Sequence, residues 1–208
     1  MEAKQRNPER IICFGDSITQ GNECGAWPSI LQEALNQRQP GRFEVINKGR
    51  SGDTSAQGFD RFESEILPHL PGILIIEFGI NDSNHRGWTQ APRGVLQEFE
   101  KNIREFRRLA TANGGRCVFI INHRLQPRIE KYINQGNGRS YQENLDPYNV
   151  IIRQVAEANG DLLIDLPRHM AENQVDLETF LYHDGVHLSQ AGTRQYGRWV
   201  FDVIQAIL

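Results

Sequence analysis

A serine, a histidine and an aspartate stand where nucleophilic chemistry would need them. Ser17 lies in the run Gly-Asp-Ser-Ile-Thr-Gln-Gly over 15–21, directly after a short apolar run. Near the other end of the chain, Asp184 precedes His187 by three residues. A hydroxyl nucleophile, an imidazole base and a carboxylate that orients the base are the groups that activate a serine for acyl transfer. We therefore interpret Ser17, His187 and Asp184 as a candidate nucleophile, base and orienting acid.

Two further residues are candidate hydrogen-bond donors. Gly52 stands in Ser-Gly-Asp over 51–53, and Asn81 stands in Gly-Ile-Asn-Asp over 79–82. The backbone N–H of a glycine and the side-chain amide of an asparagine are donors of the kind that stabilise a developing oxyanion. Taken singly, a turn glycine and an Asx turn explain these residues better. Their occurrence in order between Ser17 and His187 favours a catalytic site.

The rival function is a non-catalytic, flavodoxin-like module that holds a phosphate-bearing ligand on the 15–21 loop. Serines in glycine-containing loops often cradle anions at the start of a helix. The chain contains neither G-x-G-x-x-G nor G-x-x-x-x-G-K-[ST] here, so the usual nucleotide signatures are missing. The G-x-S-x-G elbow of α/β-hydrolases is missing too, because residue 19 is Thr.

A metal site at His183, Asp184 and His187 is a third interpretation. The i, i+4 spacing of the two histidines suits ligands on a helix, but Gly185 and a cap at Ser189 place this segment before the last helix begins. We expect neither a metal nor a cofactor.

The elements that must position these residues follow from five short apolar runs, at 11–14, 43–46, 73–78, 117–121 and 162–166. None of them alternates apolar with polar residues, so each is predicted to be a strand buried on both faces of a parallel sheet. The segments between them have the spacing of amphipathic helices. Such alternation predicts an α/β protein, a three-layer α/β/α sandwich, with one domain over 1–208.

Three helices have recognisable apolar faces or ends. The first is marked by Trp27, Ile30, Leu31 and Leu35, and another by Phe99, Ile103, Phe106 and Ala110. The second of these is expected to end at Asn-Gly-Gly over 113–115. The last helix is expected to begin after an N-cap at Ser189 and to bury Val200, Val203, Ile204 and Ile207.

A long polar stretch over 122–142 follows the fourth predicted strand, so it emerges at the carboxyl edge of the sheet, where ligands bind in open α/β folds. It is either a substrate-facing loop or a disordered one. Its charges are Arg124, Arg128, Lys131 and Arg139 against Glu130. They are either solvated loop charges or a cationic patch that favours an anionic acyl group or alcohol.

Composition excludes several other classes of function. The chain has 208 residues, 38% hydrophobic and 24% charged, and a formal net charge of −3, which gives no electrostatic reason to expect nucleic acid as a partner. Its apolar runs are too short to span a membrane. The polar first ten residues show no signal peptide, so we expect a cytoplasmic protein. Cys13 and Cys117 lie in apolar runs and Cys24 in a polar loop, and no pair has the spacing of a metal site.

Taken together, four segments resemble the sequence blocks of the SGNH, or GDSL-type, hydrolase superfamily. They are 15–17, the glycine of 51–53, 79–82 and 184–187, and the resemblance extends over residues 10 to about 192. It implies a flavodoxin-like, five-stranded parallel sheet and a triad of Ser17, His187 and Asp184. It also implies an oxyanion hole made of the Ser17 and Gly52 N–H groups and the Asn81 side chain.

The flanking sequence is similar to the bacterial esterase/thioesterase branch, notably at 26–28, 51–58 and 124–127. The loop over 128–141 is longer than in that branch. The implied activity is serine-dependent hydrolysis of small or short-chain carboxylic esters. An acyl-CoA thioesterase and a carbohydrate O-deacetylase remain as alternatives with the same triad. We expect Asp16 and Arg124 to contact the substrate, a small-molecule ester or thioester.

Overall fold

Five parallel strands form the sheet of this computed structural model, which describes residues 8–84, 91–126 and 137–208. The strands are β1 (Glu9–Gly15), β2 (Phe43–Gly49), β3 (Ile73–Glu77), β4 (Arg116–Ile121) and β5 (Leu162–Asp165). Their order is β2-β1-β3-β4-β5, the flavodoxin-like order. The winding direction switches between β1 and β3, and folds of this kind bind ligands outside the carboxyl ends of the strands at that switch.

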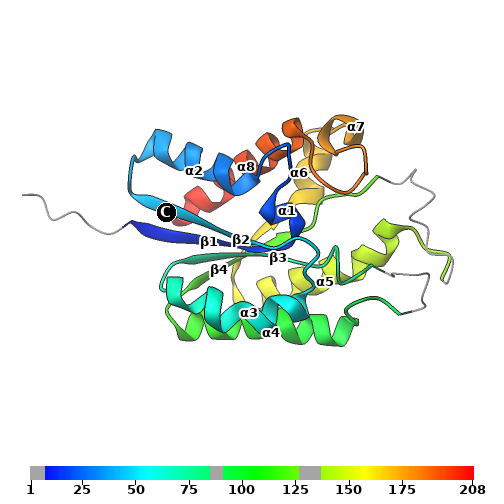
Figure 1. The fold of residues 1–208 in the computed structure, drawn as a ribbon, viewed down its shortest axis with the longest axis horizontal. Coiled ribbons are helices and arrows are strands. Elements are labelled where there is room, and N and C mark those ends of the chain that lie inside the picture. The colour runs from blue at the N-terminus through cyan, green and yellow to red at the C-terminus, as the bar shows by residue number, and fades with distance from the viewer. Residues whose placement is uncertain (1–7, 85–90, 127–136) are drawn as a thin grey trace, which may run out of the picture.

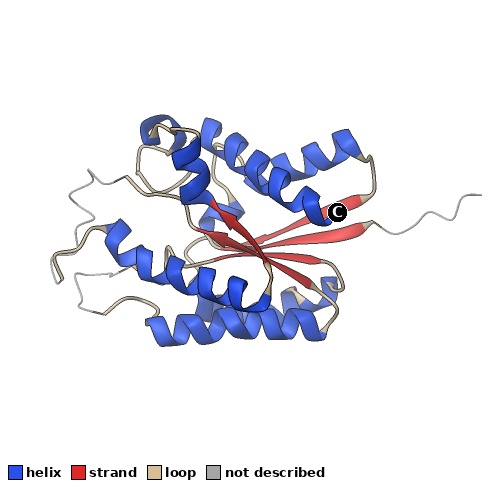
Figure 2. Ribbon diagram, turned by 180° about the vertical axis from the view of Figure 1, so that it is seen from behind, coloured by secondary structure: helices blue, strands red, loops and turns tan. Residues whose placement is uncertain are grey.

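Helices cover both faces of the sheet, so the predicted three-layer α/β/α architecture is confirmed (Figure 1). One layer holds α1 (Ser17–Gln20), α2 (Trp27–Arg38), α6 (Leu166–Glu172), α7 (Leu177–Phe180) and α8 (Gln190–Ile204). The other holds α3 (Ser55–Glu65), α4 (Leu96–Ala112) and α5 (Tyr141–Asn159). Figure 2 shows the twisted sheet between these two layers. Two 3₁₀ turns, Leu67–His69 and Gln205–Ile207, complete the described elements.

Burial differs between the central and the edge strands. Every residue of β3 is buried, whereas in β2 only Phe43 is fully buried and in β5 only Ile164. The prediction that all five strands are buried on both faces is therefore wrong for β2 and β5. Both lie at an edge of the sheet, where one side has no neighbouring strand.

Several boundaries also differ from the predicted ones. Leu166 begins α6 instead of ending β5. Ser189 caps α8 as predicted, its side chain accepting a hydrogen bond from the N–H of Gly192. Val200 and Ile204 are buried there, whereas Val203, in the last turn of α8, and Ile207, in the 3₁₀ turn that follows it, are only half-buried.

The polar stretch 122–142 is shorter as a loop than predicted. A capping box between Ser140 and Glu143 starts α5 at Tyr141, so the last two residues of that stretch are helical. Residues 127–136, with Arg128, Glu130 and Lys131, lie outside the described residues.

All three cysteines are free; Cys13 and Cys117 are buried, and Cys24 is half-buried. Among the residues that the structure describes, no helix combines the length and the apolar character needed to cross a bilayer.

An aromatic cluster packs α3 and α4 onto the sheet. Phe14 of β1 meets Phe62, Phe78 and Phe106 edge-on, with ring centroids 5.5, 4.9 and 5.1 Å away. Phe106 stacks on Phe62 at 5.2 Å. All four side chains are almost completely buried, and their burial holds the strand that leads into Ser17 against the helical layer.

We expect Phe106→Ala to lower the free energy of unfolding by about 3–5 kcal/mol, because it leaves a cavity among close-packed rings. Val150→Ala on α5 is the control, since Val150 is 53% exposed and lies outside the aromatic cluster. Its cost should stay near or below about 1 kcal/mol. Urea denaturation measures both, and equal losses for the two variants would show that the cluster is not the centre of the core.

Candidate active site

Ser17 is the first residue of α1, immediately beyond the carboxyl end of β1. Asp16 caps this short helix, its Oδ1 accepting the N–H of Ile18 at 2.9 Å. Thr19 ties the helix down by donating from Oγ1 to Glu77 Oε2 at 2.6 Å. Gly15 permits the close approach, because a Cβ there would lie 2.5 Å from the Glu77 carbonyl oxygen. Ser17 is thereby held half-buried at the switch point of the sheet.

A tight turn before α8 brings Asp184 to His187. Asp184 Oδ1 accepts the backbone N–H groups of Val186 and His187, both at 2.9 Å, and Gly185 has a φ of +73°. Asp184 Oδ2 lies 2.5 Å from His187 Nδ1, and His187 Nε2 lies 2.9 Å from Ser17 Oγ. The structure thus places the three predicted residues in one hydrogen-bonded chain.

The same geometry bears on the two rival interpretations. Both ring nitrogens of His187 already engage Asp184 and Ser17, which leaves neither as a metal ligand. Within 8–84, 91–126 and 137–208, no group of three His, Cys, Asp or Glu side chains is arranged to hold a metal ion. A phosphate on the 15–21 loop would have to face the Asp16 carboxylate, which already occupies the start of the four-residue helix α1.

Gly52 and Asn81 follow the carboxyl ends of β2 and β3, as predicted. Gly52 adopts a φ of +80°, a conformation that favours glycine. A Cβ on Gly52 would meet no atom within 4 Å, so conformation, not space, is the reason for a glycine here. In the described part of the chain, the N–H groups of Ser17 and Gly52 donate to no protein atom. Asn81 Nδ2 donates to Asp16 Oδ2 at 3.0 Å.

Arg61 and Arg93 hold these loops, and neither was expected from the sequence. Buried Arg61 donates to Asp53 Oδ2 at 2.7 Å and to the Gly15 carbonyl oxygen at 3.1 Å. Half-buried Arg93 donates to the carbonyl oxygen of Gly52 and to Asn81 Oδ1. Each arginine lies far along the chain from at least one of its partners, so no local spacing in the sequence pointed to it.

His123 was also missed, although it supports the turn that carries His187. It is fully buried beyond β4, and its Nε2 lies 2.8 Å from the Val186 carbonyl oxygen. Burial lowers the pKa of His123 to about 4. His123 is therefore neutral near pH 7, and its Nε2–H donates to that carbonyl.

The pKa of Asp184, the acid of the turn, is shifted in the opposite direction to those of the buried acids near Ser17. Partial burial raises the pKa of Asp184, but hydrogen bonds from His187 and from the N–H groups of Val186 and His187 outweigh it. The pKa of Asp184 therefore lies below its ordinary value, and Asp184 is a carboxylate at neutral pH. This is the state needed to stabilise an imidazolium.

Buried carboxyl groups lie beneath Ser17 and Asn81. Burial, helped by the charge of the neighbouring Asp82, raises the pKa of Asp16 to about 7, although the hydrogen bond from Ile18 and the proximity of His187 oppose the shift. Burial likewise raises the pKa of Asp82 to about 6 and that of Glu77 well above its usual range. Asp16 is 0% exposed, and its two carboxyl oxygens accept hydrogen bonds from the Ile18 N–H and the Asn81 amide. The structure therefore favours an internal, positioning role for Asp16 over the expected contact with substrate.

Arg124, the other expected substrate contact, is exposed just beyond β4, and its backbone N–H donates to Met170 Sδ at 3.4 Å. Its side-chain role stays a prediction. Arg139, also exposed, precedes α5. The remaining loop charges, Arg128, Glu130 and Lys131, fall outside the described residues.

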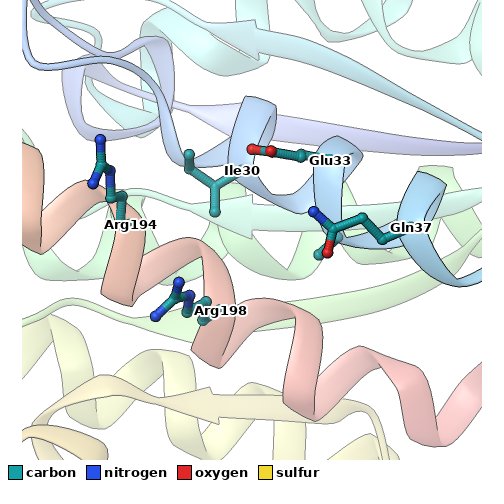
Figure 3. Close-up of a pocket in the computed structure, with 6 residues that line it drawn as sticks. Ile30, Glu33, Gln37, Arg194 and Arg198 are labelled. Carbon is teal, nitrogen blue, oxygen red and sulfur yellow. The ribbon is translucent and has the colours of Figure 1, made fainter.

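A separate groove lies between α2 and α8 (Figure 3). Glu33 and Gln37 project from α2, and Arg194 and Arg198 from α8. None of its lining residues belongs to the Ser17 site, so the groove is separate from it.

The high pKa of Asp16 has a consequence for stability. A carboxyl whose pKa is higher in the folded than in the unfolded state releases its proton on unfolding when the pH lies between the two pKa values. The free energy of unfolding therefore falls as the pH rises from about 4 to about 7. Between pH 5 and 8 we expect Asp16→Asn to lose less unfolding free energy than the wild type, by about 2–3 kcal/mol. The control Asp60→Asn, at an exposed position of α3, should follow the wild type. Urea titrations at the two pH values measure this, and parallel losses for Asp16→Asn and wild type would refute it.

Comparison with known proteins adds an independent finding. The model of the GDSL-like Lipase/Acylhydrolase family matches residues 13–195. An arylesterase of Vibrio mimicus is 33% identical over 134 residues, which span 63% of this chain and 62% of the arylesterase. An acetylxylan esterase of Geobacillus stearothermophilus is 26% identical over 211 residues, spanning 88% of each chain.

A solved structure agrees with the fold. The lipase/acylhydrolase of Enterococcus faecalis superimposes with a TM-score of 0.79 at 23% identity, covering 96% of this chain and 97% of the other. At that identity the likeness concerns the fold alone. The family model spans nearly the whole chain, as the resemblance of the four sequence blocks predicted. The chain therefore belongs to the GDSL-like lipase/acylhydrolase family of hydrolytic enzymes.

Proposed function

We propose that this protein is a serine-dependent carboxylic ester hydrolase that works through an acyl-enzyme on Ser17. The observation that carries the proposal is the hydrogen-bonded chain Asp184–His187–Ser17, which joins residues 170 positions apart in the sequence. The groups needed for acyl transfer are all supplied by side chains and backbone N–H groups, so the mechanism calls for no cofactor.

In the acylation step, Ser17 Oγ attacks the ester carbonyl while His187 Nε2 takes the hydroxyl proton. The carboxylate of Asp184 accepts the Nδ1–H bond and stabilises the imidazolium. The negative charge that develops on the carbonyl oxygen is met by the N–H groups of Ser17 and Gly52 and by the second N–H of Asn81. Collapse breaks the bond to the alcohol, which leaves with the proton from His187.

Deacylation reverses these roles with water in place of the alcohol. His187 takes a proton from water, the resulting hydroxide attacks the acyl-Ser17 carbonyl, and the same donors hold the second tetrahedral intermediate. Collapse expels Ser17 Oγ, which recovers its proton from His187. The products are the free acid and the unchanged enzyme.

For the substrate we propose a small ester with a short acyl chain. A carbohydrate O-acetyl ester is the second candidate, favoured by the similarity to the acetylxylan esterase over 88% of both chains. A thioester remains an alternative from the sequence. The cytoplasmic location, the single domain over 1–208 and the absence of a nucleic-acid partner stay predictions.

The nucleophile is tested by comparing wild type and Ser17→Ala on p-nitrophenyl esters from acetate to palmitate, on acetylated xylan and on acetyl-CoA. We expect wild-type activity to be highest on short esters and Ser17→Ala to lose essentially all of it, because Ser17 supplies the hydroxyl that His187 activates. A fluorophosphonate should label the wild type once, at Ser17. An active, folded Ser17→Ala variant would sink the mechanism.

The orienting acid is tested with Asp184→Asn. An amide keeps the shape of the side chain but favours the wrong imidazole tautomer, so we expect kcat to fall by about 10³- to 10⁴-fold while the protein stays folded. Exposed Asp202→Asn on α8 is the control and should retain wild-type kcat. Near-normal turnover of a folded Asp184→Asn would remove Asp184 from the mechanism.

A further inference from the structure

The guanidinium of Arg93 lies between the two loops of the proposed oxyanion hole. Its Nη2 donates to the carbonyl oxygen of Gly52 at 2.9 Å, and its Nη1 donates to Asn81 Oδ1 at 3.2 Å. These loops follow different strands, β2 and β3, and are separated by α3. The planar guanidinium of Arg93 therefore connects Gly52 and Asn81, the two proposed oxyanion donors, which lie on separate loops.

Arg93 and Asp16 hold the Asn81 amide from opposite ends. Asp16 Oδ2 accepts one N–H of Asn81 at 3.0 Å, while Arg93 donates to the amide oxygen. A guanidinium has only donors, so a flipped amide would turn its N–H groups toward the donors of Arg93 and lose the hydrogen bond that Asn81 Oδ1 now accepts. Only one orientation satisfies both neighbours, and it leaves the second N–H of Asn81 for a third partner.

Gly52 is held from two sides as well. Arg93 binds its carbonyl oxygen, and the next residue, Asp53, forms a buried ion pair with Arg61. Gly52 has a φ of +80°, and a glycine backbone is more flexible than that of other residues. Its conformation therefore depends on these two contacts. Without Arg93 the Gly52 carbonyl loses a charged donor, and the loop gains freedom next to the reacting atoms.

We propose that Arg93 is a positioning residue that preorganises the oxyanion hole, an inference that rests on the proposed function. Donors stabilise an oxyanion most when they need not move as the charge develops. Arg93 sets the distance between the Gly52 and Asn81 loops, fixes the amide of Asn81, and withdraws charge from its oxygen. The last effect makes the remaining N–H of Asn81 a stronger donor.

The first test is Arg93→Ala assayed on p-nitrophenyl acetate. A directly contacting oxyanion donor is worth about 10²- to 10³-fold in kcat, so we expect the loss of its support to lower kcat by roughly 10- to 100-fold. KM should stay within about threefold, because the ground-state ester gains little from the oxyanion hole. Arg104→Ala, which removes an exposed arginine of α4, is the control and should retain the wild-type kcat.

A double-mutant cycle with Asn81→Ala separates positioning from a general structural role. If Arg93 acts largely through Asn81, Arg93→Ala should cost much less in the Asn81→Ala background than in the wild type. Millimolar guanidinium should also restore part of the kcat of Arg93→Ala, and sodium at the same ionic strength should not. Equal losses in both backgrounds would overturn the positioning of Asn81 by Arg93, and no loss in the wild-type background would overturn the whole proposal.

Arg93→Lys keeps the test decisive should Arg93→Ala fail to fold. A single ammonium does not reproduce the planar fork, so we expect a smaller fall in kcat, again with KM little changed. A wild-type kcat for Arg93→Lys would contradict the bridging role. Fluorophosphonate labelling distinguishes the two levels of failure: no label on wild-type Ser17 overturns the proposed function and this inference with it. Labelling of Ser17 together with a wild-type kcat in Arg93→Ala overturns the role of Arg93 alone.

Discussion

The need to satisfy a buried carboxyl organises the geometry around Ser17. Asp16 is removed from water, so each of its oxygens must find a donor. Its Oδ1 accepts the N–H of Ile18, and this capping bond starts α1 and sets the position of Ser17. Its Oδ2 accepts an N–H of the amide of Asn81, which lies in the loop after β3. A single desolvated group thus links the proposed nucleophile to a proposed oxyanion donor.

Two arginines extend this arrangement to the loop after β2. Buried Arg61 donates hydrogen bonds to the Asp53 carboxylate and to the last carbonyl groups of β1 and β2. Arg93 donates to the Gly52 carbonyl oxygen and to Asn81 Oδ1. Removing one partner of a buried ion pair leaves an uncompensated charge, so such pairs resist rearrangement. The loops at the carboxyl edge are therefore fixed by polar contacts, whereas aromatic and aliphatic packing holds the sheet beneath them.

The turn that carries His187 is supported separately. Asp184 holds the imidazole and two backbone N–H groups, and His123, kept neutral by burial, donates to the Val186 carbonyl between them. The backbone of this turn is therefore held by contacts that do not involve the His187 ring. Its acid, Asp184, is ionised at neutral pH, whereas the buried acids below Ser17 have raised pKa values. Hydrogen bonding keeps Asp184 charged beside His187, whereas burial favours the neutral form of the carboxyl groups near Ser17.

The strand–helix alternation, the α/β class and the candidate residues could all be predicted from the sequence, the residues being Ser17, Gly52, Asn81, Asp184 and His187. They could be predicted because buried parallel strands appear as apolar runs and the reactive residues occur in short motifs at strand ends. Only the folded structure showed which strands lie at the edges, that Asp16 is internal, and that Arg61, Arg93 and His123 contact the candidate site. Burial and hydrogen bonds between residues distant in the chain decide these points, and no local pattern of residue types encodes which donor meets which acceptor.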